Sequence, residues 1–191
     1  MPHGSDAGLP TSGPSDAEFC GPLDNFARMG NASARVAVLG IGNDLSGDDA
    51  VGALVARELA ARVGRRADCL VLDAGTAPEN FTGPLRRFRP DFVLLVDAAQ
   101  LSAEPGTVAW LDWRQTDGLS ASTHTLPVSV LAQFLVQELA CRVALLVVQP
   151  AQLEFGRPLS AAVRRAADRV VDGLAETLVQ RARCNVQRAD C

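Results

Sequence analysis

The feature that most constrains the fold is the alternation of short apolar runs with longer amphipathic segments. The apolar runs are nearly unbroken, as in RVAVLGI, which is typical of strands covered on both faces of a sheet. They occupy residues 35–41, 69–72, 92–96, 106–111 and 142–148. Runs of this kind predict a largely parallel sheet inside the protein.

Segments with helical periodicity fall between these runs. Within residues 49–63, apolar side chains recur at helical spacing, as do those of residues 127–139 and 160–181. A shorter helix should end near Arg87, and Ser160 suits a helix cap. This alternation predicts an α/β three-layer sandwich, with a mostly parallel central sheet of about five strands flanked by helices.

Composition and charge exclude several classes of function. Hydrophobic residues make up 48% of the 191 residues, which suffices for one domain with a buried core. The formal net charge is −4, and the 18 Lys and Arg residues form no basic stripe for nucleic acid or an anionic membrane. No apolar run reaches the roughly 18–20 residues of a membrane span, and no signal-peptide pattern opens the chain. We expect a cytoplasmic monomer without nucleic-acid or membrane partners.

The chain divides into three predicted parts. Residues 1–33 are rich in Gly, Ser, Pro, Ala and Asp, so we expect a disordered extension that folding does not require. Residues 34–181 form the domain. Residues 182–191 are expected to be a flexible, polar tail.

The cysteines supply no obvious chemistry. There are five, at spacings that match no zinc or redox motif: Cys20, Cys69, Cys141, Cys184 and Cys191. Cys69 and Cys141 adjoin apolar strands and should be buried as small hydrophobes. An odd number in a cytosolic chain needs no disulfide. With no Ser-His-Asp order apparent either, the sequence offers no convincing nucleophile.

Acidic side chains gather where the predicted strands end. The loop after the first strand carries Asp48 and Asp49, the second strand ends in Asp73, and the third ends in Asp97. His124 lies in a later polar segment, and it is the only histidine beyond the amino-terminal extension. In parallel sheets, functional sites form at the carboxyl edge, where the strand order reverses. These residues are therefore the candidates for a site.

Two interpretations of the first loop involve no metal. The plainest is that its acids cap a helix and its glycines serve tight turns. Alternatively, Gly40-Ile41-Gly42 begins like a dinucleotide-binding motif, with Asp73 as the acid that would bind a ribose. However, Leu45 stands where the third glycine belongs, and the carboxylates beside it would repel a pyrophosphate.

The third interpretation is a divalent-metal site. Asp49 and Asp97 should project from the ends of neighbouring strands, and His124 could reach over them. Two carboxylates and an imidazole suit nickel or zinc and leave coordination positions open for a substrate. Residue chemistry alone leaves all three interpretations open.

The same motifs resemble those of the hydrogenase maturation proteases, in order, over about Arg35 to Leu178. GIGNDLSGDDAVG resembles the family's first loop, DAGTAPEN its second-strand element and DFVLLVDA its third-strand motif. STHTLP resembles its histidine loop, and VVQP resembles its last-strand ending. One departure is Ala74, where the family often has glycine, so a positive φ there would be strained.

This resemblance implies an activity and a set of site residues. Asp49, Asp97 and His124 match metal-binding positions, and Asp73 matches an acid associated with cleavage, so Asp73, Asp49 and Asp97 are the candidate catalytic residues. The implied substrate is the nickel-loaded precursor large subunit of a nickel–iron hydrogenase, whose C-terminal extension is removed. The implied nickel arrives with the substrate, and another divalent metal is an alternative in vitro.

Two mechanisms and two rival functions stay open at this point. The metal could polarise the scissile carbonyl or lower the pKa of water, with Asp73 or Asp48 as base. Alternatively, the metal only docks the substrate while an acid carries out hydrolysis. The rival functions are a non-proteolytic metal- or nucleotide-binding α/β module and a hydrolase of small substrates.

Overall fold

The computed structural model describes residue 26, residues 34–115 and residues 127–189, and it describes side chains for these residues except residue 115 and residues 183–189. Short 3-10 turns η1 (Gly47–Ala50), η2 (Pro78–Phe81) and η3 (Trp113–Gln115) join the main elements. The strands are β1 (Val36–Ile41), β2 (Cys69–Gly75), β3 (Phe92–Ala98), β4 (Val108–Leu111) and β5 (Arg142–Val148). The helices are α2 (Val51–Val63), α3 (Thr82–Phe88), α4 (Val128–Leu139) and α5 (Ala161–Ala189).

The strands form one sheet in the order β2-β1-β3-β5-β4. Four of them are parallel, and only β4, at one edge, runs antiparallel to its neighbour β5. The chain moves from β1 outward to β2 and then returns to the other side of β1 for β3. The strand order therefore reverses between β1 and β3, which is where ligand sites form in such sheets.

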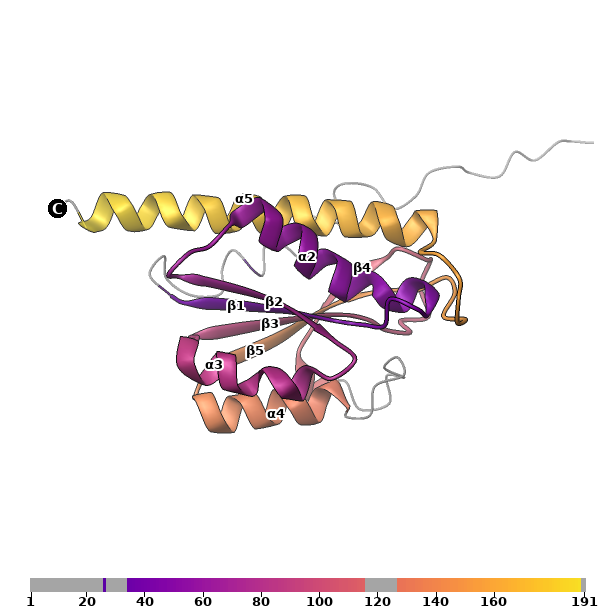
Figure 1. The fold of residues 1–191 in the computed structure, drawn as a ribbon, viewed down its shortest axis with the longest axis horizontal. Helices are drawn as coiled ribbons and strands as arrows, with labels where there is room; N and C mark the ends of the chain where they lie inside the picture. The colour runs from indigo at the N-terminus through magenta and orange to yellow at the C-terminus, as the bar shows by residue number, and fades with distance from the viewer. Residues whose placement is uncertain (1–25, 27–33, 116–126, 190–191) are drawn as a thin grey trace, which may run out of the picture.

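The helices cover both faces of the sheet, which gives the predicted three layers. α2 and α5 lie on one face, and α3 and α4 lie on the other (Figure 1). Alternate residues of each strand feed two separate apolar clusters, so that Val38 and Leu94 pack toward α2 and α5 while Leu39 and Leu95 pack toward α4. The mostly parallel α/β sandwich predicted from the sequence is confirmed.

Phe26 departs from the expectation for the amino-terminal extension. Its side chain is only 1% exposed and belongs to the apolar cluster beneath α2 and α5. Its ring lies 6.0 Å from that of Phe92, which in turn stacks on Trp110. At least this residue of the extension is part of the core, although the other residues up to 33 lie outside the described part of the chain.

The last helix also differs from its prediction. α5 continues as regular backbone to Ala189, whereas the sequence pattern ended it at Arg181. The apolar stripe that the prediction followed ends near Leu178, but the following residues include Arg, Ala and Gln, which are good helix formers. In Figure 1, α5 extends past the end of the sheet.

The structure also bears on the two cysteines beside strands and on the length of apolar helices. Cys69 and Cys141 are buried, as predicted, and neither forms a disulfide. Among the described residues, no helix is both long and apolar enough to cross a membrane.

Candidate functional site at the carboxyl edge of the sheet

The loop between β1 and α2 is built on very close backbone contacts. A Cβ added at Gly52 would lie 2.2 Å from the carbonyl oxygens of both Ile41 and Val96, and one added at Gly42 would lie 2.0 Å from the oxygen of Asp49. Only glycine permits these approaches. The glycines of GIGNDLSGDDAVG therefore bring η1 and the start of α2 against the ends of β1 and β3. That packing role accounts for the glycines that resembled a dinucleotide motif.

Asp48 is fully buried and joins η1 to the chain that follows β5. Its carboxylate accepts hydrogen bonds from the backbone N–H groups of Ser160 at 2.6 Å, Ala151 at 2.7 Å and Gln152 at 3.1 Å. Its own N–H donates to the carbonyl of Gln152 at 2.9 Å. Both carboxylate oxygens are thus committed to backbone donors, which makes Asp48 a structural anchor and leaves it unsuited to act as the base.

Asp49 and Asp97 lie at the strand-order reversal. η1, which carries Asp49, packs against β3, which carries Asp97 near its carboxyl end. Both side chains are buried, Asp49 completely and Asp97 with 2% of its surface exposed. Asp97 accepts a hydrogen bond from the N–H of Ala98 at 2.8 Å. Two carboxylates at the strand-order reversal are chemically able to offer oxygen ligands to a cation there.

The predicted third ligand, His124, lies outside the described residues. Within the described ranges, no three His, Cys, Asp or Glu side chains are grouped closely enough to hold a metal ion. The described chain therefore supplies at most two of the three predicted ligands. Carboxylate oxygens fit a divalent cation chemically, and the convergence of Asp49, Asp97 and His124 stays a prediction.

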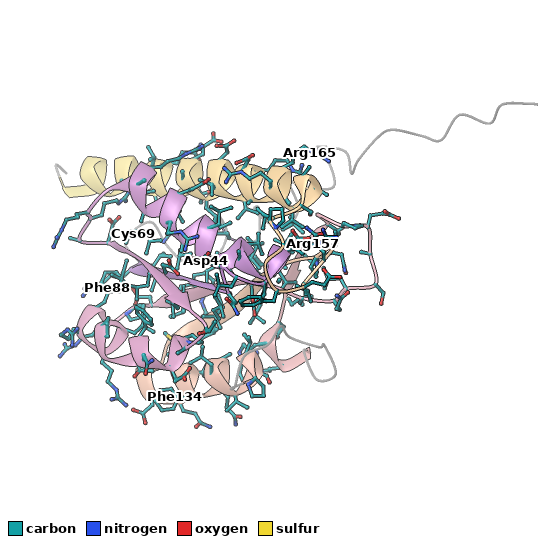
Figure 2. All side chains as sticks on the ribbon, turned by 45° about the vertical axis from the view of Figure 1, so that its right-hand side comes forward. Asp44, Cys69, Phe88, Phe134, Arg157 and Arg165 are labelled. Atoms are coloured by element: carbon teal, nitrogen blue, oxygen red, sulfur yellow. The ribbon has the colours of Figure 1, made fainter. Side chains whose placement is uncertain are left out.

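Asp73 has partners on both of its carboxylate oxygens. Arg57 of α2 donates to Asp73 Oδ2 at 2.8 Å, and the N–H of Gly75 donates to Oδ1 at 3.2 Å. Arg57 also makes a two-pronged contact with Asp44, at 2.8 and 2.9 Å; Figure 2 labels Asp44. The hydrogen bond to Asp44 raises the pKa of Arg57, burial opposes that rise, and the bond to Asp73 adds to it. The sequence motif revealed Asp73 but gave no sign of its ion pair.

The departure from the family pattern at Ala74 is accommodated without strain. The register of β1 and β2 shifts after the Gly40–Asp73 pair, so that Ile41 pairs with Gly75 and Ala74 becomes an extra residue. Gly75 has a φ of +54°, whereas Ala74 is not among the non-glycine residues with positive φ. The bulge thus places the left-handed conformation on the glycine that is present.

Gln149, in the segment VVQP, is a buried residue to which the sequence analysis assigned no role. Its Oε1 accepts a hydrogen bond from the N–H of Leu101 at 2.6 Å, and its Nε2 donates to the side chain of Gln100 at 2.8 Å and to the carbonyl of Pro150 at 3.0 Å. Gln149 therefore fixes the chain that leaves β3 just after Asp97. A buried amide directly after an apolar strand was the available signal.

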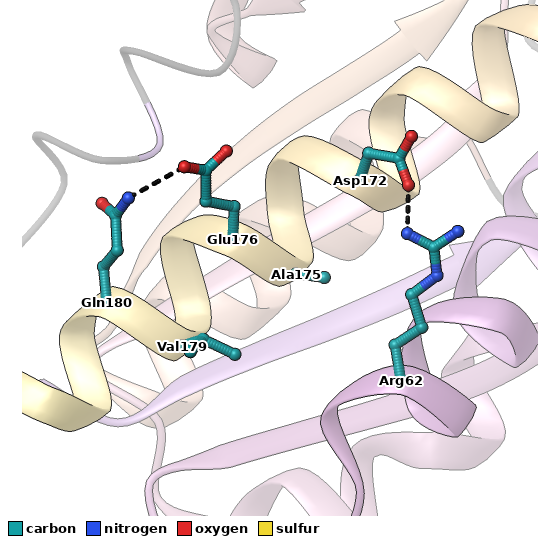
Figure 3. Close-up of a pocket in the computed structure, with 6 residues that line it drawn as sticks. All are labelled: Arg62, Asp172, Ala175, Glu176, Val179 and Gln180. Carbon is teal, nitrogen blue, oxygen red and sulfur yellow. Dashed lines mark hydrogen bonds and ion pairs between the residues drawn. The ribbon is translucent and has the colours of Figure 1, made fainter.

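A concave region lies away from these acids, on the outer surface of α2 and α5. It is lined by Arg62, Asp172, Ala175, Glu176, Val179 and Gln180 (Figure 3). Arg62 pairs with Asp172, and Gln180 donates to Glu176 at 3.0 Å. Its polar groups are satisfied by one another, so the carboxyl edge remains the better candidate site.

The protein has a mostly parallel sheet covered by helices on both faces, a first loop packed closely through its glycines, and buried acids where the strand order reverses. It is therefore an α/β protein with an acidic candidate site at the carboxyl edge of the sheet. A family model described as hydrogenase maturation protease matches residues 53–177. A putative hydrogenase maturation protease of Methanocaldococcus jannaschii is 31% identical over 150 residues, which cover 75% of this chain and 88% of that relative. The chain therefore belongs to the hydrogenase maturation protease family and is a peptidase.

Further relatives agree in sequence and in fold. The hydrogenase 3 maturation protease of Escherichia coli is 30% identical over 72% of this chain and 86% of its own length. The crystal structure of a NiFe hydrogenase maturation protease from Thermococcus kodakarensis matches with a TM-score of 0.72 at 33% identity. That match covers 82% of this chain and 97% of the other. The predicted family and fold are thereby confirmed.

Proposed function

We propose that this chain is the endopeptidase that removes the C-terminal extension from the nickel-loaded precursor large subunit of a nickel–iron hydrogenase. The observation that carries the proposal is the buried pair Asp49 and Asp97 at the strand-order reversal, in a chain of this family. Two carboxylates buried at a sheet edge are suited to recognise a cationic centre on a partner.

The nickel ion is, in this proposal, part of the substrate. Asp49 and Asp97 are covered in the free protein, so docking of the precursor has to uncover them before they and His124 can supply oxygen and nitrogen ligands. An added divalent metal occupies the same position in vitro. Carboxylate and imidazole groups both bind nickel. The enzyme therefore acts on the loaded precursor and spares the precursor that has not yet received nickel.

The reaction is hydrolysis of one peptide bond. Water adds to the carbonyl carbon, the C–N bond breaks, and the departing amine takes up a proton. A base is needed to remove a proton from the attacking water. Because Asp48 is committed to three backbone donors, the remaining candidate of the two considered is Asp73, which must first exchange its contact with Arg57 for one with water or substrate.

We also propose that the enzyme acts in the cytoplasm as a monomer and binds neither nucleic acid nor membrane. The formal net charge of −4, with scattered basic residues, supports the exclusion of nucleic acid.

The test is to incubate the protein with nickel-loaded and nickel-free precursor large subunit and to measure the intact mass of each product. The loaded precursor should lose the mass of its C-terminal extension in a single cut, and the nickel-free precursor should keep its full mass. Equal cleavage of both would contradict the nickel requirement. Cleavage of neither would contradict the proposed function.

A further inference from the structure

Two large apolar side chains are exposed beside the candidate site. Leu45 is 58% exposed in the loop after β1, and Phe155 is 76% exposed in the loop after β5. Most side chains of this kind in the described chain are buried, so both positions expose apolar surface that water solvates poorly.

Both side chains sit on hydrogen-bonded turns. The N–H of Ser46 donates to the carbonyl of Asn43 at 3.0 Å, which closes the turn that carries Leu45. The N–H of Arg157 donates to the carbonyl of Glu154 at 3.3 Å, and Gly156 has a φ of +75°, as a turn with glycine in its third position requires. These turns hold the backbone of Leu45 and Phe155 so that their side chains point outward.

The two turns are also joined to each other. The N–H of Gly156 donates to the carbonyl of Leu45 at 2.7 Å, so Leu45 and Phe155 belong to one surface although they are far apart in sequence. Below them, Asp48 ties η1 to Gln152 and Ser160 at both ends of the same loop. The apolar pair therefore stands on a base fixed by backbone hydrogen bonds, which lowers the entropy cost of binding.

Charged side chains surround the pair. Glu154 and Arg157 flank Phe155, and Asp44, adjacent to Leu45, is held by Arg57; Figure 2 labels Asp44 and Arg157. An apolar centre within a polar rim is the usual anatomy of a protein–protein contact.

We infer that Leu45 and Phe155 form a docking surface for the folded body of the protein substrate, which presents an apolar recess next to the peptide that is cut. This inference rests on the proposed function. Leu45 and Asp49 lie in the same short loop, so a protein whose peptide reaches Asp49 and Asp97 also covers Leu45 and the turn joined to it. The docking surface supplies affinity and orientation, while the acids act at the cleavage point.

The test compares the double variant Leu45→Ser/Phe155→Ser with the wild type and with Phe134→Ser, which changes a less exposed aromatic, at 37% exposure, on α4 on the other face of the sheet from α2. Binding of nickel-loaded precursor large subunit is measured by biolayer interferometry, and processing is measured by intact mass. The double variant should bind about tenfold more weakly or worse, with a raised KM and an unchanged kcat. Phe134→Ser should bind like the wild type. Thermal midpoints check folding, and Phe155→Ser alone serves if the double variant unfolds.

The outcomes separate this inference from the proposed function. If the variants bind and process precursor like the wild type, the docking surface is wrong and the proposed function stands. An equal loss in Phe134→Ser would also overturn it, because the effect would not be local. Light scattering that shows a wild-type dimer lost in the variant would assign the surface to self-association instead. If the wild type neither binds nor processes precursor, both proposals are wrong.

Discussion

At the scale of single residues, the neighbours Asp48 and Asp49 are both buried but have different tasks. Asp48 satisfies three backbone donors that no other described group replaces. Asp48→Ala should therefore lower the free energy of unfolding by about 3 kcal/mol or more. Asp48→Asn should lose less, because the amide keeps one acceptor oxygen. Urea denaturation measures both, and an unchanged midpoint in Asp48→Ala would contradict the anchoring role.

The two core cysteines also allow a prediction at this scale. Burial raises the pKa of the Cys69 and Cys141 thiols to about 11. Since a raised pKa favours the protonated thiol, only about one in a thousand is a thiolate at pH 8. Iodoacetamide at pH 8 should leave both unmodified in the native protein and should modify both in urea, as peptide masses will show. Rapid native modification together with loss of processing would instead indicate a thiol nucleophile.

At the scale of elements, the contact between α2 and the sheet depends on Gly52. Gly52→Ala places a methyl group against two backbone oxygens that cannot move apart cheaply, so we expect a loss of about 2–4 kcal/mol in urea denaturation. The matched control is Gly83→Ala in α3, where the nearest atom is an Arg87 nitrogen at 3.7 Å. Because Gly83 precedes Pro84, which disfavours a helical residue with a Cβ before it, that change should gain nothing from helix propensity but should cost at most about 1 kcal/mol. Similar losses in both variants would contradict the close-packing account.

The amino-terminal extension gives a second prediction for an element. Phe26→Ala empties a buried aromatic position next to Phe92 and should cost about 3 kcal/mol. Phe155→Ala makes the same change at an exposed position and should stay within about 0.5 kcal/mol of the wild type. The thermal midpoints of the two variants show whether the Phe26 side chain stabilises the folded domain. Equal midpoints would restore the sequence-based expectation that the extension is dispensable for folding.

These elements also show what a pattern of residues can and cannot predict. Unbroken apolar runs and helical spacing predicted the strands, the helices and the parallel sheet, because both patterns follow from burial on known faces. The burial of Phe26 was missed because the composition of residues 1–33, rich in Gly, Ser, Pro, Ala and Asp, predicted disorder, although Phe19, Leu23 and Phe26 recur at helical spacing. The end of α5 was missed because the apolar stripe stops before the helix does.

At the scale of the whole molecule, the motifs predicted which acids lie at the carboxyl edge, and the strand order explains why Asp49 and Asp97 share it. The partners of those acids were not predictable in the same way. The bonds of Asp48 to Ser160 and of Arg57 to Asp73 join segments that only the tertiary fold brings together. Sequence motifs therefore identified the candidate residues. The structure then showed that Asp48 holds the first loop in place, which leaves Asp49, Asp73 and Asp97 as the candidates for catalysis or metal binding.

The measurement that tests the central claim most directly is the processing rate of nickel-loaded precursor by Asp49→Asn, Asp97→Asn and His124→Ala. The control is Asp172→Asn, which removes an exposed carboxylate on α5. Circular dichroism and thermal midpoints establish that each variant is folded. The account predicts that each of the three site variants loses about 100-fold or more in rate, while Asp172→Asn processes like the wild type. Wild-type rates in folded Asp49→Asn or Asp97→Asn would contradict the claim that the carboxyl edge is the active site.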